Sequence, residues 1–159
     1  MIKLFCLIGL AVQLLAPPIS ADVKSDSLAI IVGRKSSFDN IAATDLPKYF
    51  RGEKTRDPDG NKIVILMREH GSAERAAVLK HIYRMTEQEY QTYFIQATFI
   101  GQVAAAPKKL NTAMAVRQFV ADNPGAMGYV RLADVDDSVK VLKIDGKAPG
   151  DENYSLRMN

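Results

Sequence analysis

The sequence has very few of the side chains on which many enzyme classes depend. It holds one cysteine, two histidines (His70 and His81) and no tryptophan. The lone Cys6 excludes a disulfide framework and a cysteine-ligated zinc site. If both histidines were helical, they would stand about 16 Å apart along the axis, too far to share a metal ion. No H-E-x-x-H or G-x-S-x-G motif is present. We therefore expect neither an enzyme nor a bound cofactor.

The chain also lacks clustered charge. Its 21 basic and 18 acidic residues give a formal net charge of +3. Nucleic-acid-binding proteins usually gather Lys and Arg on one face or tract, and no such run occurs here. A nucleic-acid partner is therefore not expected.

Only the first segment contains a long apolar run. "MIKLFCLIGLAVQLLAPPISA" has Lys3, an apolar stretch over residues 4–16, a Pro-Pro break and Ala21. This is the pattern of a cleavable secretory signal peptide, and the run is short for a transmembrane helix. Removing residues 1–21 leaves no cysteine, which is unusual for a small secreted animal domain but common in the bacterial periplasm. We predict a periplasmic domain over residues 22–159, with an uncleaved anchor as the alternative.

Apolar patterning predicts an α/β domain. Buried strands are expected within residues 27–36, 62–67, 126–132 and 138–144. Helices are expected at 44–52, 72–84, from Thr86 to about 99, and 111–123, where Thr86 with Glu89 has the capping-box spacing. Alternating strands and helices favour a mostly parallel sheet flanked by helices. The tail after about residue 145 is predicted to be loosely ordered.

The stretch "LMREHGSAERAAVLKH" places Arg68, Gly71 and Ser72 where a strand gives way to a helix. The backbone N–H groups of Ser72, Ala73 and Glu74 would point out of this helix start, and Arg68 could bind an oxyanion bidentately. Against this, Ser72 would serve any helix as an N-cap, and the carboxylate of Glu74 would repel an anion. Both interpretations stay open from these residues alone.

Two acidic stretches have simpler interpretations. "DPDGN" at residues 57–61 lacks the ligand spacing and closing glutamate of an EF-hand, so we interpret it as a turn. "DVDD" at residues 134–137 is interpreted as a solvated connection between two strands.

Four segments, taken together, resemble a known family. They are "LAIIVGRKSSFDNIAATDLPKYFRGEK", "KIVILMREHGSAERAAVLKHIY", "YFIQATFIGQ" and "NPGAMGYVRL". In this order and spacing they are similar to the phosphate-binding proteins of ABC-type phosphate uptake systems, and most of all to the short, PBP-like members. The resemblance spans about Leu28 to Leu142. It implies a single lobe of the type II periplasmic binding protein fold.

The resemblance also implies a ligand site. Arg68, Gly71 and Ser72 match the family's Arg-x-x-Gly-Ser segment, while Ala73 replaces a glycine and Glu74 replaces a threonine. It implies non-catalytic binding of inorganic phosphate or a similar oxyanion, for uptake or sensing. Ser36 and Ser37, with Arg34 and Lys35 before them, follow the first buried strand and are lower-ranked candidates for lining the same crevice.

Only one lobe's worth of motifs is present, which leaves alternatives. The chain could bind phosphate weakly, or form a homodimer that rebuilds a cleft. It could instead be an interaction domain that docks on a membrane permease or sensor without binding a solute. Glu74 and the missing second lobe favour this last alternative.

Overall fold

The structure is a computed structural model that describes residues 26–158. The predicted signal peptide, residues 1–21, lies outside these residues. Within 26–158, no helix is both long and apolar enough to cross a membrane.

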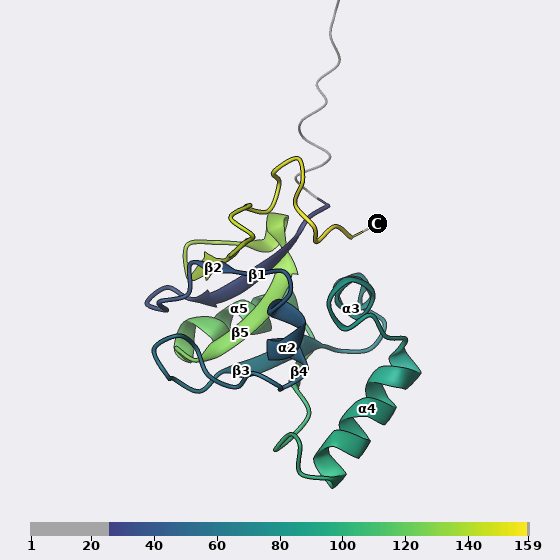
Figure 1. The fold of residues 1–159 in the computed structure, drawn as a ribbon. Coiled ribbons are helices and arrows are strands. Elements are labelled where there is room, and N and C mark those ends of the chain that lie inside the picture. Colours follow the sequence, from purple (N-terminus) through teal and green to yellow (C-terminus); the bar gives the residue numbers. More distant parts are fainter. Residues whose placement is uncertain (1–25, 159) are drawn as a thin grey trace, which may run out of the picture.

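Strands and helices alternate along the chain, as the apolar pattern predicts (Figure 1). In chain order the elements are β1 (Leu28–Gly33), β2 (Asn40–Ile41), α2 (Leu46–Phe50), β3 (Val64–Arg68), α3 (Ala73–Val78), η1 (Leu79–Tyr83), α4 (Glu87–Phe99), β4 (Lys108–Leu110), α5 (Ala113–Asp122), β5 (Ala126–Arg131), η2 (Leu132–Asp134), β6 (Val139–Val141) and β7 (Lys143–Ile144). The pattern does not predict the short strands β2 and β4. It also merges β6 and β7, which belong to different sheets.

The main sheet has five strands in the order β4-β3-β5-β1-β6. β4, β3 and β5 are mutually parallel, whereas β1 is antiparallel to both β5 and β6. Four strands therefore run in one direction and only β1 runs against them, which confirms the mostly parallel sheet. β2 and β7 form a separate parallel pair. Every residue of β1 is buried, because the sheet is covered on both faces.

Helix α5 covers one face of the sheet. Val116 and Val120 of α5 pack on small and branched side chains from four strands: Ala29, Ile31, Leu66, Ala126, Val130 and Val139. Gly128 of β5 brings the helix close, since a Cβ there would lie 2.7 Å from a Val116 methyl carbon. The two layers therefore pack closely at Gly128.

The other face carries α2, the helix formed by α3 and η1, and α4. Its centre is aromatic, with edge-on contacts of Tyr83 with Phe50 (5.8 Å between ring centroids), Tyr90 (5.0 Å) and Phe94 (6.1 Å). Tyr90 and Phe94 lie on the buried face of α4 and fix that helix to the body. The far end of α4 projects away from the sheet (Figure 1).

The helix starts follow the local sequence. Thr86 and Glu89 form the predicted capping box of α4, and Thr112 caps α5 by accepting from the N–H of Ala115. The helix predicted over 72–84 begins at Ala73 but widens to π-type turns over η1.

The C-terminal tail is packed, in contrast to the loose order predicted after residue 145. Tyr154 and Leu156 are buried, at 3% and 4% exposure. The Tyr154 hydroxyl donates to the carbonyl of Leu28 (2.9 Å), and the N–H of Leu28 donates to the carbonyl of Leu156 (3.0 Å). These two apolar side chains cover the start of β1. Two apolar residues in a polar stretch are too short a pattern to predict such packing from the sequence.

Candidate functional site

The connection from β3 to α3 holds five of the predicted ligand-binding residues. β3 ends at Arg68, a short loop follows, and α3 begins at Ala73. Gly71 has φ of +90°, a left-handed conformation that strongly favours glycine, and it turns the chain into the helix. Ser72, Ala73 and Glu74 then form the helix start.

The guanidinium of Arg68 is only partly used. Its Nη2 donates to the carbonyl of Asn111, just before α5, at 3.1 Å. Its Nε and Nη1 are buried and hydrogen-bond to no atom within residues 26–158. The backbone of Arg68 is held firmly, because its N–H donates to the Tyr129 hydroxyl at 2.8 Å. An arginine with a fixed backbone and two unpaired guanidinium nitrogens therefore lies at the end of β3, near the start of α5.

Ser72 is an N-cap. Its Oγ accepts from the N–H of Arg75 and donates to the carbonyl of Glu69, both at 3.2 Å. The capping interpretation of Ser72 is confirmed, and its hydroxyl proton is already directed at a protein carbonyl.

Glu74 lies beside the same arginine. It is 7% exposed, and its Oε1 accepts from Nε of Arg131 at 2.9 Å. Burial raises the pKa of Glu74, but its own backbone N–H, the Arg131 hydrogen bond and the charges of Arg68 and Arg131 together hold that pKa below its ordinary value. Glu74 is therefore a charged carboxylate within the field of Arg68.

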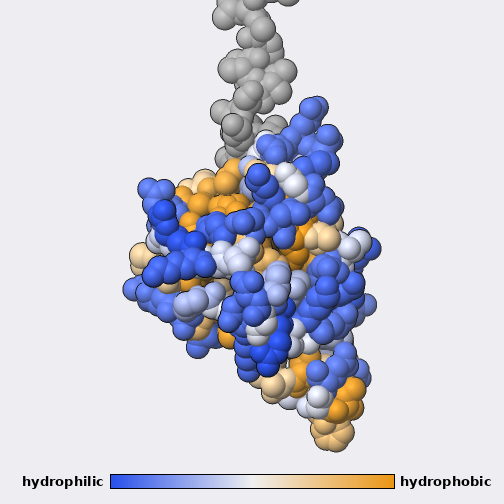
Figure 2. All heavy atoms as spheres, turned by 60° about the vertical axis from the view of Figure 1, so that its left-hand side comes forward, coloured by the Kyte–Doolittle hydropathy of each residue, from blue (hydrophilic) through white to orange (hydrophobic). Residues whose placement is uncertain are grey.

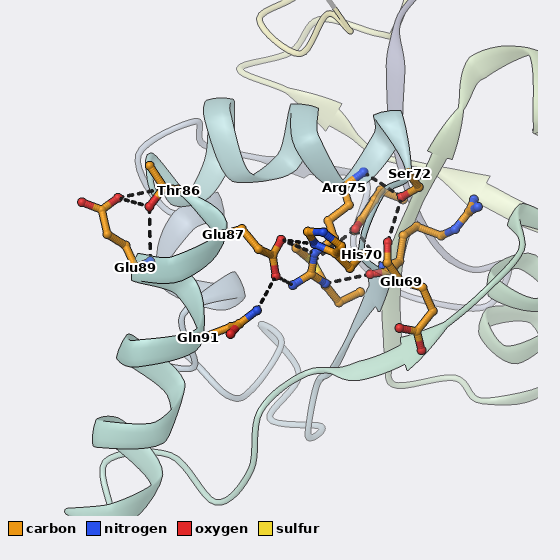
Figure 3. A network of polar contacts seen from close by, with 11 residues as sticks. Glu69, His70, Ser72, Arg75, Thr86, Glu87, Glu89 and Gln91 are labelled. Atoms are coloured by element: carbon orange, nitrogen blue, oxygen red, sulfur yellow. Dashed lines mark hydrogen bonds and ion pairs between the residues drawn. The ribbon is translucent and has the colours of Figure 1, made fainter.

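A second polar network ties α3 to α4 (Figure 3). Arg75, 2% exposed, donates from Nε and Nη2 to the two carboxylate oxygens of Glu87, at 2.8 and 2.7 Å. Its Nη1 donates to the carbonyl of Arg68 at 2.7 Å. His70 Nδ1 and Gln91 Nε2 approach the same carboxylate, at 3.4 and 3.2 Å. The hydrogen bonds from Arg75 lower the pKa of Glu87 to about 2.

Sequence reasoning missed Arg75, Glu87 and Arg131. An arginine and a glutamate in the first turns of two helices look like solvent-exposed side chains, and nothing local indicates that they pair. A groove of about 680 Å³ lies beside this network, between the starts of the two helices. It is lined by His70, Gly71, Ser72, Ala73, Arg75, Ala76, Leu79, Lys80, Arg84, Met85, Thr86, Glu87 and Glu89.

Ser36 and Ser37 do not join this site, so the prediction that they line the same crevice is wrong. Because β1 is antiparallel, its carboxyl end lies at the opposite edge of the sheet from Arg68. Val32 pairs with Met127, which is also the partner of Ile65 near the start of β3. Ser36 instead lines a small depression with Asp57, Pro124 and Gly125.

Within 26–158, no group of three His, Cys, Asp or Glu side chains is placed to hold a metal ion. At the β3–α3 connection the unpaired guanidinium donors of Arg68 suit an anion, whereas the Glu74 carboxylate beside them opposes one.

No protein-family model matches the chain. Solved structures do. An ABC-type phosphate transport receptor from Vibrio cholerae matches with a TM-score of 0.63 and 21% identity, over 78% of this chain and 48% of that one. PstS from Borrelia burgdorferi matches with a TM-score of 0.65 and 16% identity, over 84% and 55%. A protein from Clostridium perfringens, described as a phosphate ABC transporter substrate-binding protein and solved with bound phosphate, matches with a TM-score of 0.64 and 22% identity, over 78% and 47%.

The chain has the fold of a single lobe of these phosphate-binding proteins. It spans about half the length of the structures it matches. The fold implied by the sequence resemblance is thus confirmed.

Proposed function

We propose that the chain is an exported, non-catalytic binding protein for phosphate or a similar oxyanion, serving uptake or sensing in the periplasm. The observation that carries the proposal is Arg68 at the end of β3, whose Nε and Nη1 have no hydrogen-bond partner among residues 26–158. Charge-assisted hydrogen bonds from such a group suit an oxyanion. The likeness in fold to phosphate-binding proteins supports the same ligand class.

The neighbouring residues would contribute through the backbone. Gly71 turns the chain so that the N–H groups of Ser72 and Ala73 open the helix. The hydroxyl of Ser72 caps α3 and is committed to that contact. Glu74 opposes binding, because its carboxylate competes with the ligand for the field of Arg68. The expected affinity is therefore modest.

A second candidate is a periplasmic interaction domain that docks on a membrane permease or sensor without binding solute. The observation that favours it is the ion pair of Glu74 with Arg131, which fills part of the cationic cluster with the protein's own carboxylate. A homodimer that places two such lobes face to face would instead restore a two-sided cleft and favour the first proposal.

Thermal unfolding with phosphate titrated to millimolar levels separates the candidates. Phosphate at a hundred times its Kd adds about 2.7 kcal/mol of stability, which raises Tm by several degrees. Arg68→Ala is expected to abolish the increase. Arg56→Ala, which removes an exposed arginine bonded only to the Gly60 carbonyl, should keep it. Sulfate and chloride serve as controls.

Two results would contradict the proposal. One is an equal rise in Tm with chloride, which would reflect ionic strength alone. The other is an Arg68→Ala variant that still responds to phosphate as the unmodified protein does. A rise with both phosphate and sulfate would widen the ligand class to tetrahedral oxyanions.

A further inference from the structure

The projecting end of α4 carries a cluster of exposed apolar side chains. Ile95 is 71% exposed, Phe99 90% and Ile100 70%. These three residues, here named the apolar tip, are the majority of the five large hydrophobic side chains that residues 26–158 expose. The end of α4 stands out from the body in Figure 1, and a hydrophobic patch lies at the corresponding lower end of the surface in Figure 2.

The apolar tip has no role in the fold. The buried face of α4 is formed by Tyr90, Phe94 and Ala97, which pack into the aromatic core. Ile95 and Phe99 are separated by one helical turn and share the outward face. Apolar side chains gathered on a surface in this way mark a contact with another phase or molecule.

The segment that carries the apolar tip has no negative side chain, although the exposed Glu53 acts through its charge on Tyr93 of the same helix. Residues 90–121 contain no aspartate or glutamate. The loop that follows the tip, residues 102–107, lines a groove together with Lys62 and Lys108. Lys108 and Lys109 are both exposed on β4. Lys62 and Lys108 thus border the groove that adjoins the loop after the tip, and the Lys108 ammonium lies 5.4 Å from the centre of the Phe119 ring of α5.

We propose that the apolar tip inserts into the surface of an anionic phospholipid bilayer. The apolar side chains would lie deepest, in the hydrocarbon, and the lysines would lie at the level of the anionic headgroups. A projecting helix end can reach below the headgroups. An acidic protein partner would instead need an apolar pocket that fits the tip. The contact proposed for this part of the chain is peripheral insertion of the helix end. This proposal is independent of oxyanion binding.

Vesicle co-sedimentation tests it. The chain beginning at Asp22 keeps residues 26–158 entire, and with them every strand and helix named above. We expect it to bind vesicles of phosphatidylcholine with 30 mol% phosphatidylglycerol, a composition chosen at roughly the anionic content that attracts polybasic surfaces. The double variant Phe99→Ser/Ile100→Ser should bind at least ten-fold more weakly. Met114→Ser, which removes a 65% exposed apolar side chain of α5, is the matched control and should bind normally.

The lysines give a second readout. Lys108→Gln/Lys109→Gln is expected to lower the partition constant about five-fold for each lysine at low salt, and the loss should shrink in 0.5 M salt. Absence of binding to the anionic vesicles would overturn the proposal, as would equal binding of the Phe99→Ser/Ile100→Ser variant. Sedimentation velocity tests whether the tip forms a dimer instead. If the unmodified protein is a dimer, does not bind vesicles, and becomes monomeric in the Phe99→Ser/Ile100→Ser variant, the surface contacts a second copy of the chain and the membrane proposal is overturned.

Discussion

Arg68 and Arg75 stand on either side of the same loop, yet the protein uses them differently. All three guanidinium nitrogens of Arg75 are hydrogen-bonded, two of them to Glu87 and one to a backbone carbonyl. Its guanidinium also lies 4.7 Å from the centre of the Tyr90 ring. Within the part of the chain that the structure describes, the Arg68 guanidinium makes one hydrogen bond, and two of its nitrogens are buried without a partner.

The difference separates a structural arginine from a candidate binding arginine. A buried charge is tolerated when it is paired and fully hydrogen-bonded, as Arg75 is. Arg68 leaves two buried donors unpaired within residues 26–158, more than any other arginine there, and a buried group left unpaired is costly. The contrast predicts that Arg75 variants change stability, and that variants around Arg68 change the response to anions.

The largest expected effect is on stability. Arg75→Met should lower the free energy of unfolding by about 3 kcal/mol, because it leaves the Glu87 carboxylate and the Arg68 carbonyl without their donor. Urea unfolding followed by circular dichroism measures the loss. Arg117→Met is the control: it breaks an ion pair with the half-exposed Asp136 and should cost less than about 1 kcal/mol. Equal losses for the two variants would remove the distinction between structural and spare arginines.

Next in size is an effect on anion affinity. Glu74→Gln keeps a hydrogen-bond acceptor for Arg131 but removes the negative charge beside Arg68. We expect the phosphate affinity to rise about ten-fold, because the substitution removes the repulsion between the Glu74 carboxylate and the phosphate. This repulsion is stronger in a site less polar than water. Isothermal titration calorimetry measures the change, with the exposed Glu53→Gln as control. An unchanged affinity would mean that Glu74 does not face the ligand.

Ser72→Ala is expected to have a smaller effect. Losing the N-cap should cost about 1 kcal/mol of stability, the same as Thr112→Ala at the start of α5. Because the Ser72 hydroxyl already serves Arg75 and Glu69, the phosphate-dependent rise in Tm should remain. If that rise disappears in Ser72→Ala but not in Thr112→Ala, the hydroxyl contacts the ligand directly.

The last expected effect appears only in acid. The folded-state pKa of Glu87 is about 2, below the ordinary value of 4.5, so its pairing with Arg75 stabilises the fold fully above pH 4.5. That contribution is lost as the pH falls from 4.5 toward 2. In Glu87→Gln the stability should fall less steeply across this interval than in the unmodified protein. Thermal unfolding at stepped pH measures the slopes, and a variant with an unchanged slope would argue against this pair as the source.

Local sequence signals predicted local structure well. Thr86 with Glu89 gave the start of α4, and Asn123-Pro124-Gly125 gave the end of α5, because caps and helix stops depend on residues a few positions apart. The aliphatic run of β1 predicted a strand buried on both faces. The connection holding Arg68 to Glu74 was predicted for the same reason, since its residues are contiguous.

Long-range relations were not available from the pattern. The β1 sequence does not indicate whether the strand runs parallel or antiparallel to its neighbours. Taking it as parallel placed Ser36 and Ser37 at the same edge of the sheet as Arg68, which is wrong. The pairing of Glu74 with Arg131 joins α3 to the end of β5, and its two halves look like ordinary surface charges. Leu156 likewise looks like an isolated apolar residue in the sequence, and only the fold shows that it packs beside β1.

The packing of the C-terminal tail on β1 affects where the chain could be opened and rejoined. Asp26 accepts from the N–H of Met158, and Ser27 pairs with Arg157, so the two ends of the described fold lie side by side. A short linker could join them without disturbing the sheet. New ends opened in the exposed loop at residues 104–106 would leave each named strand and helix whole. The fold is therefore suited to circular permutation, and to insertion as a cassette into a surface loop of a host protein.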